Sequence, residues 1–186
     1  HADFATISSD DFPEIEISEE QVPVSLESNV LKRILSKTSF SMASQDVRYY
    51  LNGMLLEING NKINGVATDG HRLAYSSAAT SNSEADMRNI LPRKAVLELA
   101  KLLSAGDDTI NLLIGPSYVV IRTENLSFSS KLIDGKYPDY DKVFPTGEPL
   151  PLEISKEVLQ SALSRASVLS NDCLLYTSPS PRDGIG

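Results

Sequence analysis

Apolar and polar positions repeat along the chain in two ways, and each way predicts a kind of element. A spacing of three to four residues runs through 28–40 and 92–104 and predicts two amphipathic helices, the second opened by Pro92 and followed by Gly106. Alternation in other parts of the chain predicts strands. These strands cover 22–27, a hairpin from 47 to 77, and segments near 109–115, 117–123 and 126–133. The stretch 78–89 is predicted to be a polar loop, mobile where it is rich in Ser, Ala and Thr.

The hairpin is the most specific of these elements. A strand-like run over 47–58 leads through Asn59-Gly60-Asn61 into a second strand, which is the pattern of a tight β-turn. The second strand ends at 68–72, where the backbone is expected to bend at Gly70. Two helices and about seven strands predict an α+β fold in which both helices lie on one face of antiparallel sheets.

The chain also contains an internal repeat with an offset of 154 − 26 = 128 residues. The matching positions are Leu26, Val30, Leu31, Leu35, Ser36 and Lys37 with Ile154, Val158, Leu159, Leu163, Ser164 and Arg165. A repeat of this length indicates duplicated domains rather than a solenoid. We therefore expect 1–20 to be the end of one domain, 21–146 a complete second domain, and 147–171 the start of a third.

The last residues, 172–186, depart from the repeat. Pro179 and Pro181 lie too close together for a central strand, although the repeat requires a strand there. We interpret 172–186 as a non-native tail and give its Cys173 no functional role. Cys173 is the one cysteine of the chain, so no internal disulfide is possible.

Charge is distributed unevenly along the chain. The formal net charge is −8, but the acids gather in 10–20 and 134–141. The helix predicted over 28–40 carries three basic residues and no acid, and the helix over 92–104 carries three against Glu98. Basic helices on an acidic body suit a protein that contacts DNA on one surface only. Solvated helix faces with no partner are an equally open interpretation.

Several classes of function lack the residues that they need. No apolar run approaches the roughly 20 residues of a membrane span, and a single cysteine suits a reducing, cytoplasmic location. Asp69 and His71 could form an acid–base pair, but the chain has no Gly-x-Ser-x-Gly elbow, no glycine-rich phosphate loop and only one other histidine. We therefore expect a non-catalytic protein without metal or cofactor.

Three separated segments carry a resemblance to a known family. They read Val-Arg-Tyr-Tyr-Leu-Asn-Gly-Met-Leu-Leu-Glu-Ile over 47–58, Val-Ala-Thr-Asp-Gly-His-Arg-Leu-Ala-Tyr over 66–75, and Leu-Ile-Asp-Gly-Lys-Tyr-Pro-Asp-Tyr over 132–140. In this order they resemble the bacterial DNA sliding clamps, the beta subunits of DNA polymerase III, and the similarity extends from about residue 3 to 171. The resemblance implies the DNA-clamp fold, three similar domains, and a homodimer ring around double-stranded DNA that gives the polymerase its processivity.

The resemblance implies a DNA-contacting surface on the helices and on one loop. The residues concerned are Lys32, Arg33, Lys37, Arg93 and Lys94 on the helices, and Gln45, Arg48, Tyr49 and Tyr50 in the loop. Basic side chains there attract phosphates without reading bases, and the tyrosines could meet sugars or exposed bases. Alternatively, the two tyrosines begin a strand and one of them packs inward. Ser44 stands where some relatives have histidine.

The resemblance further implies a groove for short peptides of partner proteins. Its residues are Leu51, Thr68, Gly70, His71, Arg72, Leu73, Pro138, Lys142 and Val143. The implied partners are the catalytic subunit of DNA polymerase III, clamp-loader subunits, and repair and translesion polymerases. Lys142 occupies a position where many relatives have arginine. Two alternatives remain open: a structural strand end with a buried histidine at 68–73, and a peptide-binding adaptor that does not encircle DNA.

Overall fold

The computed structural model describes residue 8 and residues 22–80, 86–103, 108–145, 147 and 150–167. The chain divides into two compact units, His1–Asp141 and Lys142–Gly186. The predicted tail 172–186, Gly106, and 1–20 apart from residue 8 lie outside the described residues. The first unit contains both sheets and the two helices that were predicted from the apolar spacing.

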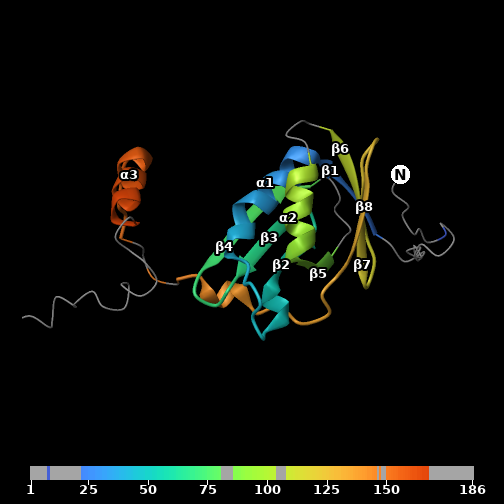
Figure 1. The fold of residues 1–186 in the computed structure, drawn as a ribbon, viewed down its shortest axis with the longest axis horizontal. Helices are drawn as coiled ribbons and strands as arrows, with labels where there is room; N and C mark the ends of the chain where they lie inside the picture. Colours follow the sequence, from blue (N-terminus) through green and yellow to red (C-terminus); the bar gives the residue numbers. More distant parts are fainter. Residues whose placement is uncertain are drawn as a thin grey trace, which may run out of the picture. The chain divides into compact units, whose positions relative to one another are not determined.

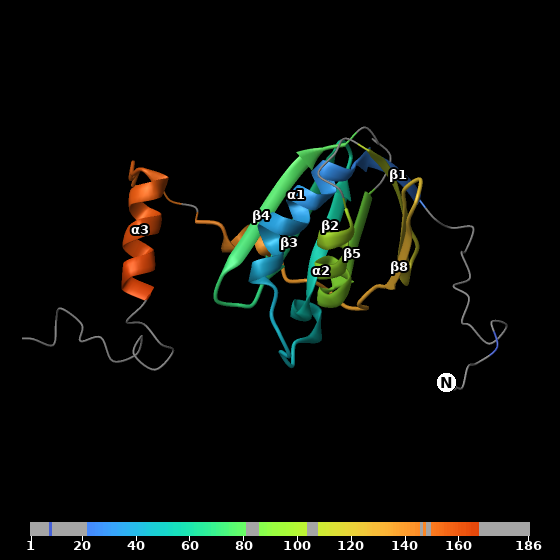
Figure 2. The same cartoon turned by 45° about the horizontal axis from the view of Figure 1, so that its top comes forward.

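Two four-stranded antiparallel sheets form the first unit (Figures 1 and 2). One sheet has the order β1-β6-β7-β8 and the other the order β4-β3-β2-β5. The strands are β1 (Val22–Glu27), β2 (Gly53–Asn59), β3 (Lys62–Thr68), β4 (Leu73–Ala79), β5 (Asp86–Pro92), β6 (Thr109–Ile114), β7 (Tyr118–Arg122) and β8 (Ser127–Lys131). Helices α1 (Ser28–Thr38) and α2 (Arg93–Leu102) pack on one face of the second sheet, which confirms the expected α+β arrangement.

The main hydrophobic core lies between the helices and the inner faces of the two sheets. Leu31, Ile34 and Leu35 of α1 are buried in it, as the apolar spacing of that helix predicted. In β3, alternate residues face opposite sides, so Ile63 belongs to this core. Each helix therefore packs one side against the core and exposes the opposite side to solvent.

Close contact between α1 and the sheet depends on Gly65 of β3. A Cβ atom added at this position would overlap with Cγ2 of Ile34. Only glycine lets the helix approach the strand this closely.

We expect Gly65→Ala to lower the free energy of unfolding by about 1–3 kcal/mol, because the added methyl group forces the helix or the strand to move. Urea unfolding followed by circular dichroism measures this change. Gly60→Asn is the matched control, since Gly60 has φ +54° and no atom near its Cβ position, and asparagine tolerates positive φ. Equal stability of the two variants would contradict the close-packing explanation.

A second, smaller core covers the outer face of the sheet β4-β3-β2-β5. It consists of Ala43, Leu51, Leu55, Val66, Ile90, Tyr137 and Tyr140. The two tyrosines belong to the segment 132–140, which follows β8 and is joined to β5 by the hydrogen bond from Ile133 N–H to the Ile90 carbonyl (2.9 Å). The two central strands, β2 and β3, are thus buried on both faces, which explains the nearly continuous apolar pattern of β2.

The predicted start of the hairpin was wrong. Residues 47–52 do not extend β2; they contain the 3-10 helix η3 (Tyr49–Asn52), and β2 starts at Gly53. The cause is local: the Asp46 carboxylate accepts a hydrogen bond from Arg48 N–H, and Leu51 N–H donates to the Arg48 carbonyl. These bonds close turns in a stretch whose side chains alternate like those of a strand.

The predicted polar loop 78–89 was wrong at both ends, where 78–79 and 86–89 belong to strands, and its middle part, 81–85, lies outside the described residues. Strand β4 continues to Ala79, and β5, starting at Asp86, pairs with β2 along its whole length. Both are outer strands of the sheet with alternately exposed positions, so their composition resembles that of a loop. The helix boundaries shift slightly as well: α1 ends at Thr38, and Pro92 is the last residue of β5 rather than the first of α2.

The second unit contains helix α3 (Lys156–Ser167). It begins 156 − 28 = 128 residues after the start of α1, so the helix predicted from the repeat is present in the same register. Ser155 precedes it, and its hydroxyl accepts the Val158 N–H and donates to the Glu157 carboxylate. In the described part of the chain, α3 has no buried residue.

Candidate functional site

The exposed side of α1 and α2 carries the predicted basic residues, but these residues differ in their contacts. Arg33, Lys37 and Lys94 are exposed. The ammonium group of Lys32 donates to the Leu103 carbonyl (2.8 Å) at the end of α2, and Nη1 of Arg93 donates to the Met42 carbonyl (3.1 Å). Lys32 and Arg93 therefore use hydrogen-bond donors to hold the helices in place. Arg33, Lys37 and Lys94 form the exposed part of this basic surface.

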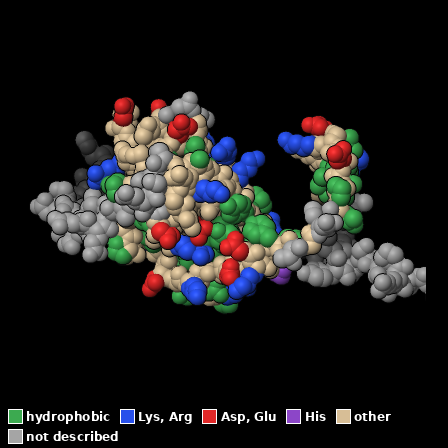
Figure 3. All heavy atoms as spheres, turned by 180° about the vertical axis from the view of Figure 1, so that it is seen from behind, with side chains coloured by type: hydrophobic (Ala, Val, Ile, Leu, Met, Phe, Trp, Pro, Cys, Tyr) green, Lys and Arg blue, Asp and Glu red, His purple; other side chains and the backbone are tan. Residues whose placement is uncertain are grey.

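The opposite side of the sheet has a different charge pattern. Figure 3 shows the face turned away from α1 and α2, where acidic and basic side chains lie among one another. On that face, Arg88 of β5 pairs with the buried Glu57 of β2 (3.2 Å). The excess of basic over acidic residues found on the two helices is not repeated there, so electrostatics favours the helical side for a polyanion.

The loop before η3 is held by an internal ion pair. Nε and Nη2 of Arg48 donate to the two carboxylate oxygens of Asp46 at 3.0 and 2.8 Å. These hydrogen bonds lower the pKa of the Asp46 carboxyl to about 2. Gln45 next to it has φ +60°, an uncommon backbone conformation for a residue other than glycine. The predicted phosphate ligand Arg48 is thus held in a fixed position, with about half of its side chain exposed.

Tyr49 and Tyr50 differ in environment. Tyr49 is 57% exposed, whereas Tyr50 is half-buried against the outer core. Their rings contact edge to face with centroids 5.8 Å apart. Tyr50 packs inward, as the alternative interpretation predicted for one of the two tyrosines. Tyr49 presents its ring to solvent, as the DNA-contact interpretation requires. Neither tyrosine starts a strand.

The end of β3 forms a tight turn through Gly70, as predicted, with φ +90°. The Asp69 carboxylate accepts hydrogen bonds from His71 N–H, Arg72 N–H and Nε of Arg72, each at 3.0 Å. The bond from His71 N–H is the main cause that lowers the pKa of Asp69. Asp69 therefore acts as a turn-forming residue, and its bonds go to backbone amides and a guanidinium.

The turn and the η3 loop contact each other through Arg48. Its Nη2 donates to the Asp69 carbonyl (3.3 Å), and its guanidinium lies 3.1 Å from the place where Gly70 would carry a Cβ. Arg72 lies over the ring of Phe40, with 5.9 Å from the guanidinium carbon to the ring centroid. His71 is exposed, so the alternative of a buried histidine was wrong.

The predicted groove residues of the first unit gather at one end of the sheet β4-β3-β2-β5. Leu51 is only 2% exposed and belongs to the outer core, Leu73 is half-buried beside that core, and Pro138 is exposed. Thr68 binds Arg72 across the turn through its hydroxyl. Lys142 and Val143 fall in the second unit, where both are exposed.

The prediction missed two buried tyrosines next to the predicted groove residues. The hydroxyl of Tyr137 accepts the Thr68 N–H (3.1 Å), and the hydroxyl of Tyr140 donates to the Glu57 carboxylate. Burial raises the pKa of Tyr137 to about 12, although the Thr68 N–H acts in the opposite direction. Burial, followed by the bond to Glu57, also raises the pKa of Tyr140. An acid inside the apolar strand β2 was the sequence signal for such a partner.

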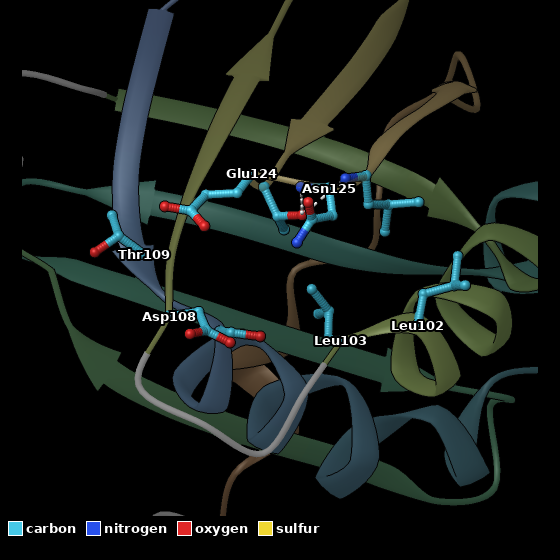
Figure 4. A pocket seen from close by; sticks show the side chains of 9 residues that line it. Leu102, Leu103, Asp108, Thr109, Glu124 and Asn125 are labelled. Atoms are coloured by element: carbon cyan, nitrogen blue, oxygen red, sulfur yellow. Dashed lines mark hydrogen bonds between the residues drawn. The ribbon is translucent and has the colours of Figure 1, made fainter.

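A cavity of about 450 Å³ lies elsewhere in the first unit, beside the start of α1 and the turn between β7 and β8 (Figure 4). Asp108 and Glu124 stand on its wall together with Leu102 and Leu103. The described residues of its lining include no basic side chain and none of the predicted site residues, so it belongs to neither surface described above.

The described residues contain no group of three or more metal-binding side chains close together. In the same part of the chain, no helix has the length and apolar character needed to cross a membrane.

Two antiparallel sheets with two helices on one side define a domain of the DNA-clamp class. The family profile described as the central domain of the DNA polymerase III beta subunit matches residues 25–139. The chain belongs to the DNA polymerase III beta subunit family.

Individual relatives agree with this assignment. Over 90% of this chain, the sequence is 47% identical to the beta sliding clamp of Vibrio cholerae and 41% identical to that of Escherichia coli K12. The crystal structure of the DNA polymerase III subunit beta from Pseudomonas aeruginosa has a TM-score of 0.82 at 42% identity, covering 90% of this chain and 46% of that one. The Bacillus subtilis clamp has a TM-score of 0.84 at 25% identity, with coverages of 89% and 44%. The chain spans about half the length, 46%, of the curated relatives that it matches.

Proposed function

We propose that this chain is the central part of a sliding clamp, a non-catalytic processivity factor that encircles duplex DNA and tethers the replicative polymerase to it. Membership in the DNA polymerase III beta subunit family is the observation that carries this proposal. The relatives named beta sliding clamp support it over 90% of the chain.

In the proposed function, the helical side faces DNA. Arg33, Lys37 and Lys94 are exposed there and attract the phosphate backbone without reading bases. Exposed side chains on long flexible stems exchange phosphates easily, so the contacts hold the duplex while allowing the protein to slide. Arg48 and Tyr49 add contacts from the loop before η3, with Arg48 held ready by Asp46.

The groove binds partners in this proposal. Peptides with apolar side chains pack against Leu73 and Pro138. These peptides belong to the polymerase catalytic subunit, to clamp-loader subunits, and to repair and translesion polymerases. The space that a Cβ at Gly70 would need is next to the Arg48 guanidinium, so Gly70 serves the turn and its contact with Arg48. Leu51 lies beneath this surface and supports it from the outer core.

The proposed domain arrangement follows the internal repeat. Residues 21–146 form the middle domain, 1–20 the end of a preceding domain and 147–171 the start of a third. Helix α3, which begins in the same register as α1, supports the last part of this division. Three such domains in each of two chains complete the homodimer ring in the proposal.

Peptide binding by the 186-residue chain tests the groove. We expect Leu73→Ala to weaken binding of a fluorescent Gln-Leu-x-Leu-Phe peptide by about tenfold, since a half-buried leucine loses part of the roughly 1.5–3 kcal/mol of full burial. Fluorescence anisotropy gives the dissociation constants. The matched control is Ser77→Ala on the same strand, an exposed residue away from the turn. Equal affinities of the two variants would place the peptide elsewhere.

A further inference from the structure

The segment 132–140 carries one groove residue, Pro138, between two buried tyrosines. Tyr137 is 5% exposed and Tyr140 is 6% exposed, whereas Pro138 and Asp139 between them are exposed. The position of Pro138 on the surface is therefore set by the anchors on either side of it. Each anchor ends in a hydroxyl group that bonds to the sheet β4-β3-β2-β5.

The first anchor is bonded directly to the groove. The pairing of β2 with β3 ends at Leu55 and Val66, so β2 offers no ladder partner to Thr68 two residues further on. The Thr68 N–H is donated instead to the Tyr137 hydroxyl at 3.1 Å. Since buried backbone N–H groups need a partner, this bond completes the end of β3. It also connects the residue before Pro138 to the first residue of the Gly70 turn.

The second anchor is bonded to the middle of the sheet. Glu57 accepts hydrogen bonds from the Tyr140 hydroxyl and from the Asn64 amide (3.2 Å), and it pairs with Arg88 (3.2 Å). Asn64 in turn accepts a bond from the Tyr75 hydroxyl (3.0 Å). The network includes a residue of each of the four strands, so Tyr140 fixes the end of the segment 132–140 to the whole sheet. The distance between Pro138 and the Gly70 turn then depends on Tyr137.

We propose that Tyr137 is a positioning residue of the peptide groove, which holds Pro138 and Thr68 at a fixed separation through its hydroxyl group. This inference rests on the proposed groove function. A groove whose two sides are already fixed loses less conformational entropy when a peptide binds, and therefore binds more tightly. The ring of Tyr137 contributes to the outer core, but the positioning depends on the hydroxyl group.

Tyr137→Phe isolates the hydroxyl because it keeps the ring and its burial. We expect peptide affinity to fall about three- to tenfold, the factor that corresponds to one net hydrogen bond, mainly through faster dissociation. Amide hydrogen exchange at Thr68 should become faster in the same variant. Tyr118→Phe on β7 is the control, since it removes a hydroxyl in the other sheet.

A double-mutant cycle with Pro138→Ala distinguishes positioning from general stability. If the hydroxyl acts through Pro138, the two changes together cost less affinity than the product of their separate effects. The proposal is overturned if Tyr137→Phe binds the peptide like the Tyr118→Phe control, if the effects are independent, or if Thr68 exchange does not change. If the unsubstituted chain binds no peptide, the proposed groove itself is refuted and the positioning role with it, while Thr68 exchange still reports whether the hydrogen bond exists.

Discussion

Replacing Arg33, Lys37 and Lys94 by glutamate is expected to lower the affinity of the chain for duplex DNA on the order of 100-fold at low salt. These three side chains are exposed on the helical side and lie on the two helices that carry few acids. Each phosphate contact that is lost should also reduce the slope of log affinity against log salt by about one unit, so the slope should fall by about three. Titrations of a labelled duplex at several salt concentrations measure both quantities.

The control for this experiment must change the net charge by the same amount. Lys62, Arg122 and Lys131 are exposed basic residues on strands, and their replacement by glutamate also makes the net charge more negative by six. If DNA responds to the helical surface, this second variant keeps most of the affinity and of the salt slope. An equal loss in both variants would mean that DNA senses only the total charge. Lys32 and Arg93 are left unchanged because they also bond to the carbonyls of Leu103 and Met42.

The parts of the fold that follow from periodicity could be predicted from the sequence. Helices α1 and α2 and strands β6, β7 and β8 lie within a few residues of the expected bounds. The helices, β6 and β7 each have one clearly apolar side facing the core, whereas β8 packs only Phe128 against it. The strands β4 and β5 were harder to recognise, since exposed alternate positions make outer strands polar. Tertiary pairing with β2, rather than local propensity, makes 86–92 a strand.

The candidate site shows the same division between local and distant determinants. The turn at Gly70 was predictable, because one residue with positive φ and its neighbours define it. The ion pair of Arg48 with Asp46 is also local, but the sequence does not say whether an exposed arginine bonds to its neighbour or points to a ligand. The bond between Glu57 and Tyr140 joins residues 140 − 57 = 83 positions apart, which no periodicity reveals. Sequence reasoning can therefore identify candidate surface residues of the site, but not the buried residues that hold them in position.

Alkaline unfolding should reveal those buried tyrosines. The pKa of Tyr137 is raised by burial to about 12, against about 10 for an unfolded tyrosine. The stabilisation from the protonated hydroxyl is therefore fully present below pH 10 and is lost as the pH rises through about 12. We expect the free energy of unfolding to fall by roughly 2 kcal/mol over this window from Tyr137 alone, with a further loss from Tyr140, whose pKa is raised by burial and by Glu57.

Urea unfolding at pH 8, 10, 11 and 12 measures this loss, and the double variant Tyr137→Phe, Tyr140→Phe should show a distinctly shallower decline. Lysines also titrate in this range, so the comparison requires Tyr49→Phe, which removes an exposed tyrosine and should behave like the unsubstituted chain. Identical declines in all three proteins would contradict a buried-tyrosine mechanism. Ionisation of Tyr137 does not break the bond from the Thr68 N–H, because a phenolate accepts this hydrogen bond more strongly than a hydroxyl does. The loss of stability comes instead from a charge buried in the outer core. Peptide affinity is expected to decrease in the same pH window, because this core supports the proposed groove.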